Sequence, residues 1–349
     1  MVSLRSALLL GAWLPLLGGC QLSYFTKSAY HQLDLLNQRI PIETALKDPN
    51  LKPEYKKKLE LTQEVRQFCA EKLGLNIEKN YTSFVDLKRP YVTYVVSAAH
   101  PWELEHHEFK YPIVGKMPYK GFFIEADAQA EEQSLKKQGL DTYLRGVTAY
   151  STLGWFKDPV LSSMLEMSEH DFINTLIHET VHATLYIKNS ADFNEQLATF
   201  LGNKGTELFY LEKEGPQSPT LQIIRDEQHD DLLFAQFIES ELKLLTEWYA
   251  SLKSESRSEE SKEQRLREIQ NRFQQTLVPQ LKTSSYQRFS KLKLNNARLM
   301  VYKTYMHSLD SFALAYEKLG GDFKLFMEKM KTLEKSESPE QEIVKMSHQ

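Results

Sequence analysis

Two histidines four residues apart, with a glutamate directly after the first, form the segment His178-Glu179-Thr180-Val181-His182. On a helix, residues at this spacing project from the same face about one turn apart, so both imidazoles can bind one tetrahedral Zn²⁺. Glu179 projects beside that face, where a carboxylate can accept a proton from a water that zinc activates. The pattern therefore predicts one zinc ion per chain, with His178 and His182 as ligands and Glu179 as general base.

A third protein ligand is expected soon after this segment. Glu195 is the first candidate, because a helix returning after a turn would bring its carboxylate back beside the histidines. The pattern Asp192-x-x-Glu195 also resembles a capping box, in which the carboxylate would face the backbone instead. Asp192 and Glu207 are the alternative ligands.

The helix that must position the histidines has a clear start signal. Ser168 and Asp171 form a capping pattern, and the apolar residues that follow it recur at helical spacing: Phe172, Ile173, Leu176, Ile177, Val181 and Leu185. We expect this helix to end near residues 188–189. A second helix is expected at roughly 192–202.

Outside these two helices, the sequence predicts a small sheet in a mainly helical α+β chain. Runs of β-branched and aromatic residues predict strands at 91–97, 120–124 and 141–156, the last with a turn near Gly154. Apolar residues at helical spacing predict helices within 27–75 and at 126–137, 221–252 and 294–333. Residues 334–349 are expected to be disordered.

The N-terminus has the pattern of a secretory signal. Arg5 precedes the apolar stretch 7–17, and Gly18-Gly19-Cys20 follows it. Leu17-Gly18-Gly19-Cys20 resembles a bacterial lipobox, which implies lipidation of Cys20 and a membrane anchor in the cell envelope, at the outer membrane facing the periplasm. A plain signal peptide or a buried N-terminal helix is the alternative. The formal net charge of −4 argues against a nucleic-acid partner.

A long central block resembles a family of bacterial lipoproteins described as predicted zinc aminopeptidases, which are similar to the gluzincin metallopeptidases. The segments that carry the resemblance are Val95-Val96-Ser97-Ala98-Ala99, Pro118-Tyr119-Lys120-Gly121-Phe122-Phe123, Arg145-Gly146-Val147-Thr148-Ala149-Tyr150-Ser151-Thr152-Leu153-Gly154-Trp155-Phe156, the histidine helix, Phe193-Asn194-Glu195 and Asn295-Asn296-Ala297-Arg298. The resemblance implies that His178, His182 and Glu195 bind zinc and that Glu179 is the general base and acid.

The resemblance also implies a zincin-like catalytic domain with an HExxH helix. The expected organisation is a lipoprotein signal peptide at 1–19, an N-terminal helical region at 20–89, the catalytic core at 90–205, a helical C-terminal region packed on the core at 206–333, and the tail at 334–349. The implied activity is hydrolysis of peptides, as an aminopeptidase. A zinc endopeptidase acting on envelope proteins and a non-catalytic zinc-binding assembly module are the alternatives.

Two further features would suit a peptidase. In zincins an edge strand binds extended substrate, and Tyr150, Ser151, Thr152 and Gly154 are placed for that role, with an ordinary core strand as the alternative. A tyrosine often stabilises the oxyanion beside zinc. Tyr302, Tyr305 and Tyr150 are the candidates, although packing in an aromatic core is an alternative role for each of them.

Overall fold

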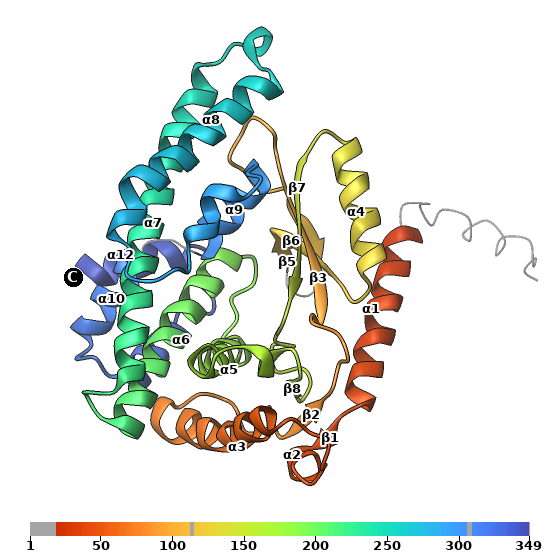
Figure 1. Cartoon of the computed structure of the whole chain (residues 1–349), viewed down its shortest axis with the longest axis vertical. Coiled ribbons are helices and arrows are strands. Elements are labelled where there is room, and N and C mark those ends of the chain that lie inside the picture. Colours follow the sequence, from red (N-terminus) through yellow and green to blue (C-terminus); the bar gives the residue numbers. More distant parts are fainter. Residues whose placement is uncertain (1–18, 112–114, 306–308, 349) are drawn as a thin grey trace, which may run out of the picture. The chain divides into compact units, whose positions relative to one another are not determined.

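The computed structural model describes residues 19–111, 115–305 and 309–348 of the 349-residue chain (Figure 1). The chain divides into two compact units, Met1–Arg39 and Ile40–Gln349, and α1 (Gly19–Asn37) lies in the first. Residues 1–18 of the expected signal peptide and the side chain of Cys20 lie outside what the structure describes. None of the described helices combines the length and hydrophobicity that crossing a bilayer requires.

The strands of the second unit form three small sheets. In the first sheet the strand order is β1 (Ile40–Pro41), β2 (Ser83–Val85), β8 (Val160–Leu161). In the second sheet it is β6 (Tyr119–Phe122), β3 (Thr93–Ala99), β7 (Asp141–Val147). The third sheet pairs β4 (Phe109–Tyr111) with β5 (Gly115–Met117). The pair β2–β8 is parallel, and the other pairs are antiparallel.

Helices make up most of the described chain, which confirms the predicted α+β, mainly helical class. The helices of the second unit are α2 (Ile42–Ala45), α3 (Pro53–Phe68), α4 (Glu125–Lys137), α5 (Glu169–Thr184), α6 (Ala191–Glu214), α7 (Pro219–Ser251), α8 (Glu259–Arg272), α9 (Asn296–Tyr305), α10 (Asp310–Lys318), α11 (Phe323–Lys331) and α12 (Pro339–His348). Short 3-10 and π-helical turns connect some of them, at Cys69–Leu73, Met164–Glu166, Ser254–Ser256, Phe273–Leu277, Val278–Gln280 and Gln287–Lys291.

The central strand β3 is covered by helices on both faces, which explains why apolar residues are favoured along its length. Val95, Val96 and Ala98 are all buried, although successive side chains of a strand point to opposite faces. Both α4 and α9 pack against β3 and β7, and Figure 1 shows them on the two sides of the sheet. A strand covered in this way is expected to be continuously hydrophobic.

The capped helix predicted from the sequence is α5. The backbone N–H of Asp171 donates to the side chain of Ser168 at 3.2 Å, which satisfies one of the free amides of the first turn. The predicted apolar stripe is buried. The helix ends at Thr184, earlier than the predicted 188–189, because the backbone becomes extended at Leu185. The second helix, α6, continues well past the predicted residue 202.

The C-terminal region differs from the expectation in two places. The predicted helix 294–333 is divided into α9, α10 and α11, and the backbone at Gly320 and Gly321 has positive φ between the last two. Residues 339–348, expected to be disordered, form α12, which packs against α10 and buries Ile343. The expected boundaries at residues 90 and 205 fall inside the unit Ile40–Gln349.

A buried polar cluster joins the sheet to the C-terminal helices. The ammonium of Lys262, on α8, lies 2.8 and 2.9 Å from the two carboxylate oxygens of Asp141 at the start of β7. The same carboxylate accepts the backbone N–H of Asn296 at 2.8 Å. The Asn296 side chain donates to the carbonyl of His100 and accepts from the hydroxyl of Tyr249 on α7, both at 2.8 Å. The Asn295-Asn296 segment is thus a structural junction.

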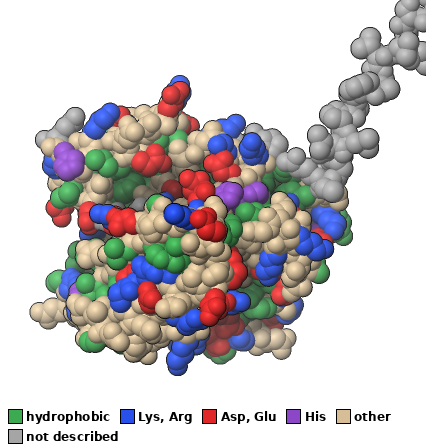
Figure 2. All heavy atoms as spheres, turned by 90° about the horizontal axis from the view of Figure 1, so that it is seen from above, with side chains coloured by type: hydrophobic (Ala, Val, Ile, Leu, Met, Phe, Trp, Pro, Cys, Tyr) green, Lys and Arg blue, Asp and Glu red, His purple; other side chains and the backbone are tan. Residues whose placement is uncertain are grey.

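Charged side chains of both signs are interspersed on the face that Figure 2 shows. This mixture agrees with the small net charge of −4. Among the large hydrophobic side chains that are exposed, Trp155 and Phe156 are adjacent in sequence and follow β7.

Candidate metal centre

The three predicted ligand side chains converge at one place. His178 and His182 lie one turn apart on α5, and their Nε2 atoms are 3.2 Å from each other. Oε2 of Glu195, on α6, lies 3.5 Å from Nε2 of His178 and 3.6 Å from Nε2 of His182. His182 and Glu195 are buried, and His178 is half-buried. Two imidazoles and one carboxylate therefore face a common point.

The spacing of these atoms fits zinc. Zinc holds nitrogen and oxygen ligands at about 2.0–2.2 Å in a tetrahedron, so neighbouring ligand atoms lie about 3.3–3.6 Å apart. The three observed separations, 3.2, 3.5 and 3.6 Å, agree closely with the edges of such a tetrahedron. Three protein donors leave a fourth position for water or substrate, which is typical of a catalytic rather than a structural site.

The nearby histidines also favour the ionised form of the Glu195 carboxyl. Burial alone would raise the pKa of this carboxyl, but His182 and His178 outweigh burial and hold the pKa well below its usual range. Tyr119, at the start of β6, donates its hydroxyl to the other carboxylate oxygen, Oε1, at 3.4 Å. The carboxylate is thus ionised and oriented with Oε2 toward the histidines.

The alternative third ligands are engaged elsewhere. The carboxylate of Asp192 accepts the hydroxyl of Thr304 at 2.9 Å, and Glu207 pairs with Lys204 at 2.8 Å. The capping-box interpretation of Glu195 is wrong, because α6 begins at Ala191 after a residue that makes no side-chain cap. Of the three candidates, Glu195 is the one that faces the histidines.

Two local features place α5 and α6 at the required separation. The α5–α6 connection is held by Asn194, whose buried side chain accepts the N–H of Ile187 at 2.9 Å and donates to its carbonyl at 2.7 Å. Where the helices approach, α6 carries Gly202, and a Cβ there would lie 3.2 Å from Oδ1 of Asn174 and 3.4 Å from Cβ of His178, both on α5. A larger residue at 202 would therefore push against the helix that carries the histidines.

We expect Asn194→Ala to weaken zinc binding about 10- to 100-fold, because partners that orient a ligand typically contribute this much to metal affinity. The substitution leaves Glu195 in place but frees the connection before it. Titration with a chromophoric zinc chelator measures the affinity.

Asn203→Ala is the matched control for this prediction. Asn203 also joins the two helices, because its side-chain oxygen accepts the side chain of Asn174 at 2.8 Å, but it makes no contact with the α5–α6 connection. We expect it to lower stability with a smaller change in zinc affinity. Equal losses of affinity in the two variants would show that Asn194 has no specific effect on the metal centre.

The predicted base, Glu179, lies on α5 directly after His178. The backbone amide of Ser151 lies near its carboxylate and acts to lower its pKa. Burial raises the pKa of Glu179 to about 7; the neighbouring His178 opposes this shift, and Glu195 adds to it. The carboxyl is therefore close to the ligands and to the segment that follows β7.

This segment is not the edge strand that the sequence predicts. The strand β7 ends at Val147, and Tyr150, Ser151, Thr152 and Gly154 lie in a loop with positive φ at Leu153 (54°) and Gly154 (77°). The backbone N–H of Thr152 donates to the buried carboxylate of Asp158 at 3.0 Å, and the Thr152 hydroxyl does so at 2.6 Å. Together with the Trp155 N–H, which donates to the Thr152 carbonyl at 3.0 Å, these bonds form a tight turn in place of an extended strand.

Of the predicted oxyanion tyrosines, Tyr302 lies in the hydrophobic core. Tyr302 packs its ring against Phe234 and Phe289 in the aromatic cluster beside α7, so it has the core role that the sequence left open. The ring of Tyr150 packs edge-on against Phe123. The side chain of Tyr305 lies outside what the structure describes.

Two tyrosines that the sequence analysis missed lie near the ligands. Tyr119 contacts Glu195, and the ring of Tyr186 has its centroid 6.4 Å from that of His182. Burial, and then the charge of Glu195, raises the pKa of Tyr186 to about 12, so its hydroxyl stays protonated. The spacing of four residues from His182 to Tyr186 was the available signal, whereas the contact of Tyr119 depends on how the sheet packs.

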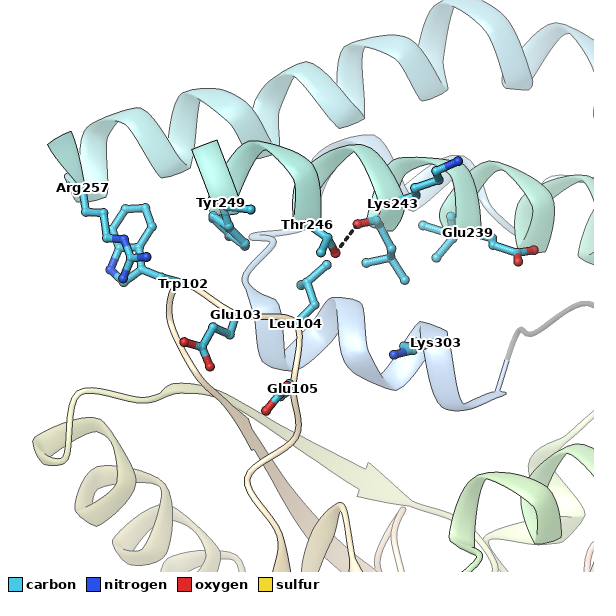
Figure 3. A pocket seen from close by; sticks show the side chains of 13 residues that line it. Trp102, Glu103, Leu104, Glu105, Glu239, Lys243, Thr246, Tyr249, Arg257 and Lys303 are labelled. Carbon is cyan, nitrogen blue, oxygen red and sulfur yellow. Dashed lines mark hydrogen bonds between the residues drawn. The ribbon is translucent and has the colours of Figure 1, made fainter. Parts of the chain in front are cut away.

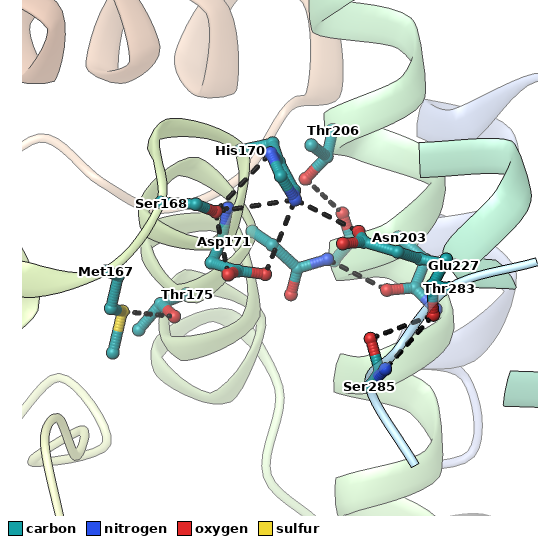
Figure 4. A network of polar contacts seen from close by, with 12 residues as sticks. Met167, Ser168, His170, Asp171, Thr175, Asn203, Thr206, Glu227, Thr283 and Ser285 are labelled. Carbon is teal, nitrogen blue, oxygen red and sulfur yellow. Dashed lines mark hydrogen bonds and ion pairs between the residues drawn. The ribbon is translucent and has the colours of Figure 1, made fainter. Parts of the chain in front are cut away.

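A second group of possible metal-binding side chains lies at the start of α5 (Figure 4). Nε2 of His170 is 3.0 Å from a carboxylate oxygen of Glu227 on α7 and 3.8 Å from one of Asp171. Asp171 is exposed and also accepts the hydroxyl of Ser168. This arrangement is a polar network that links the cap of α5 to α7.

A cavity of about 570 Å³ lies between the loop after β3, α7 and α9 (Figure 3). Trp102 and Leu104 line it together with acidic and basic side chains, among them Glu239 and Lys303. None of the three ligand candidates lines this cavity. It is therefore distinct from the metal centre.

A family model described as "Putative aminopeptidase" matches residues 23–344. The matched range contains the whole candidate metal centre and the Asn295-Asn296 junction. No curated protein and no solved structure matches the chain.

Proposed function

The chain belongs to this "Putative aminopeptidase" family, and on that basis we propose that it is a zinc-dependent aminopeptidase. The observation that carries the zinc dependence is the convergence of His178, His182 and Glu195 at the spacing of a tetrahedral site. A carboxylate next to the ligands supports hydrolysis rather than a purely structural metal, because a structural site has no use for it.

When bound, zinc supplies the Lewis acidity that polarises a peptide carbonyl and makes water nucleophilic near neutral pH. Glu179 accepts the proton of the attacking water and later delivers it to the nitrogen of the leaving amine. The nearby backbone amide of Ser151 acts to lower the pKa of Glu179 and so favours the carboxylate form that accepts the proton. His178, His182 and Glu195 would hold the metal.

The expected result of a peptidase assay on the full-length protein is hydrolysis of aminoacyl reporters that is lost on removal of zinc and restored by one equivalent. Internally quenched peptides with a blocked N-terminus serve as the comparison. If only the blocked peptides were cleaved, the protein would be an endopeptidase rather than an aminopeptidase. A protein that binds one zinc and cleaves neither substrate would instead be a binding module.

A further inference from the structure

We propose that Trp155 and Phe156 bind an apolar side chain of the peptide substrate, on the side of the leaving amine. The inference rests on the proposed function and adds a substrate class to it. The two residues lie in the loop between β7 and β8, directly after the turn at Leu153 and Gly154, and they are 68% and 44% exposed. Large aromatic side chains in such exposed positions are typical of binding surfaces.

The loop lies along the flank of α5 that carries the base. Glu179 and Ala183 are four residues apart and share this flank. The amide of Ser151 lies near the Glu179 carboxylate, and a Cβ added at Gly154 would lie 3.4 Å from the carbonyl oxygen of Ala183. The loop therefore follows α5 for about one turn, and the aromatic pair comes directly after Gly154.

The loop is held in a defined conformation. Leu153 has φ of 54°, a left-handed conformation that a non-glycine residue keeps only where the surroundings enforce it. The enforcing contacts are those of Thr152 with Asp158, together with the Phe156 N–H, which donates to the Thr152 hydroxyl at 3.2 Å. The aromatic pair is thus presented by a backbone that needs little ordering when a ligand binds.

The position of Glu179 indicates which part of the substrate lies next to the loop. Its carboxylate returns the proton to the leaving nitrogen, so that nitrogen must lie within hydrogen-bond reach of it. The residue that contributes this nitrogen is then the part of the substrate nearest to the loop. An apolar side chain on that residue can bury against the exposed rings of Trp155 and Phe156.

The test uses peptides that differ only in the residue after the cleaved bond, which is phenylalanine, leucine, glycine or serine. Binding is measured by calorimetry on zinc-loaded full-length Glu179→Gln protein, so that no peptide is consumed, and kcat/KM is measured with an active Glu179. We expect phenylalanine and leucine to be preferred over glycine by on the order of tenfold or more. Trp155→Ala should reduce the preference several-fold, and Trp155→Phe should restore part of it.

Leu325→Ala, at an exposed position of α11, is the surface control and should leave the preference unchanged. The inference is wrong if Trp155→Ala keeps the preference, if apolar and small residues bind equally, or if no peptide binds. It is also wrong if Trp155→Ala only weakens binding to anionic lipid vesicles, since the loop would then contact a membrane. Absence of hydrolysis with the binding preference intact would refute the proposed function alone.

Discussion

Glu179→Gln is expected to keep its zinc and to lose about a thousandfold in kcat. Glutamine has nearly the shape of glutamate, so the variant should leave the packing around the ligands unchanged. It cannot take a proton from water or return one to the leaving amine, and general acid–base catalysis of this kind typically contributes about 10²–10⁴-fold. The measurements are kcat on an aminoacyl reporter and zinc content per chain by atomic absorption.

Glu195→Gln provides the contrast to this variant. It keeps Glu179 as the base but weakens the third zinc ligand. Its activity should fall together with its zinc content, whereas Glu179→Gln should lose activity alone. If Glu179→Gln retained activity within tenfold of the unmodified protein, Glu179 would not be the base.

Asp141→Ala is expected to destabilise the zinc-loaded protein by roughly 3–5 kcal/mol, because removing one partner leaves an unpaired buried charge. Lys262 is only 2% exposed, and Asp141 is the acidic group that its ammonium contacts. The substitution also takes away the acceptor of the Asn296 amide at the start of α9. Urea unfolding, followed by circular dichroism, gives the free energy of unfolding.

Glu263→Ala is the matched control on the same helix. Glu263 neighbours Lys262, but its pair with Arg267 is exposed, and exposed pairs contribute about 0–1 kcal/mol. In addition, Lys262→Met in the Asp141→Ala background should recover part of the loss, because the buried charge is then gone. A loss below about 1 kcal/mol for Asp141→Ala would show that the pair does not anchor the sheet.

Local patterns predicted the helix that carries the histidines because the interactions that form it are local. The cap of Ser168 on Asp171 and the apolar stripe of α5 depend on residues within a few positions of one another. The strands 91–97 and 120–124 and the helix 126–137 appear within a few residues of their predicted bounds for the same reason.

Elements that depend on distant contacts were predicted less well. Residues 334–349 have a composition typical of a solvated tail, yet α12 is ordered by packing against α10, which the sequence pattern does not reveal. The predicted strand through Tyr150 ends at Val147, and the loop after it is fixed by Asp158, which bonds to Thr152 and whose own N–H donates to the distant Asn80 side chain. The composition around Tyr150 is typical of a strand, but side-chain hydrogen bonds to the backbone compete with strand pairing, and the segment forms a loop instead.

By itself, the sequence determined the spacing of His178, Glu179 and His182 on one helix, because helical periodicity follows from the backbone. The tertiary structure alone decided which carboxylate faces them. Asp192, Glu195 and Glu207 all lie on α6, and only the angle at which α6 crosses α5, held by Asn194 and Gly202, brings Glu195 to the histidines. The tertiary structure also placed Tyr302 in the aromatic cluster and Tyr119 against Glu195, because both contacts join segments far apart in the chain.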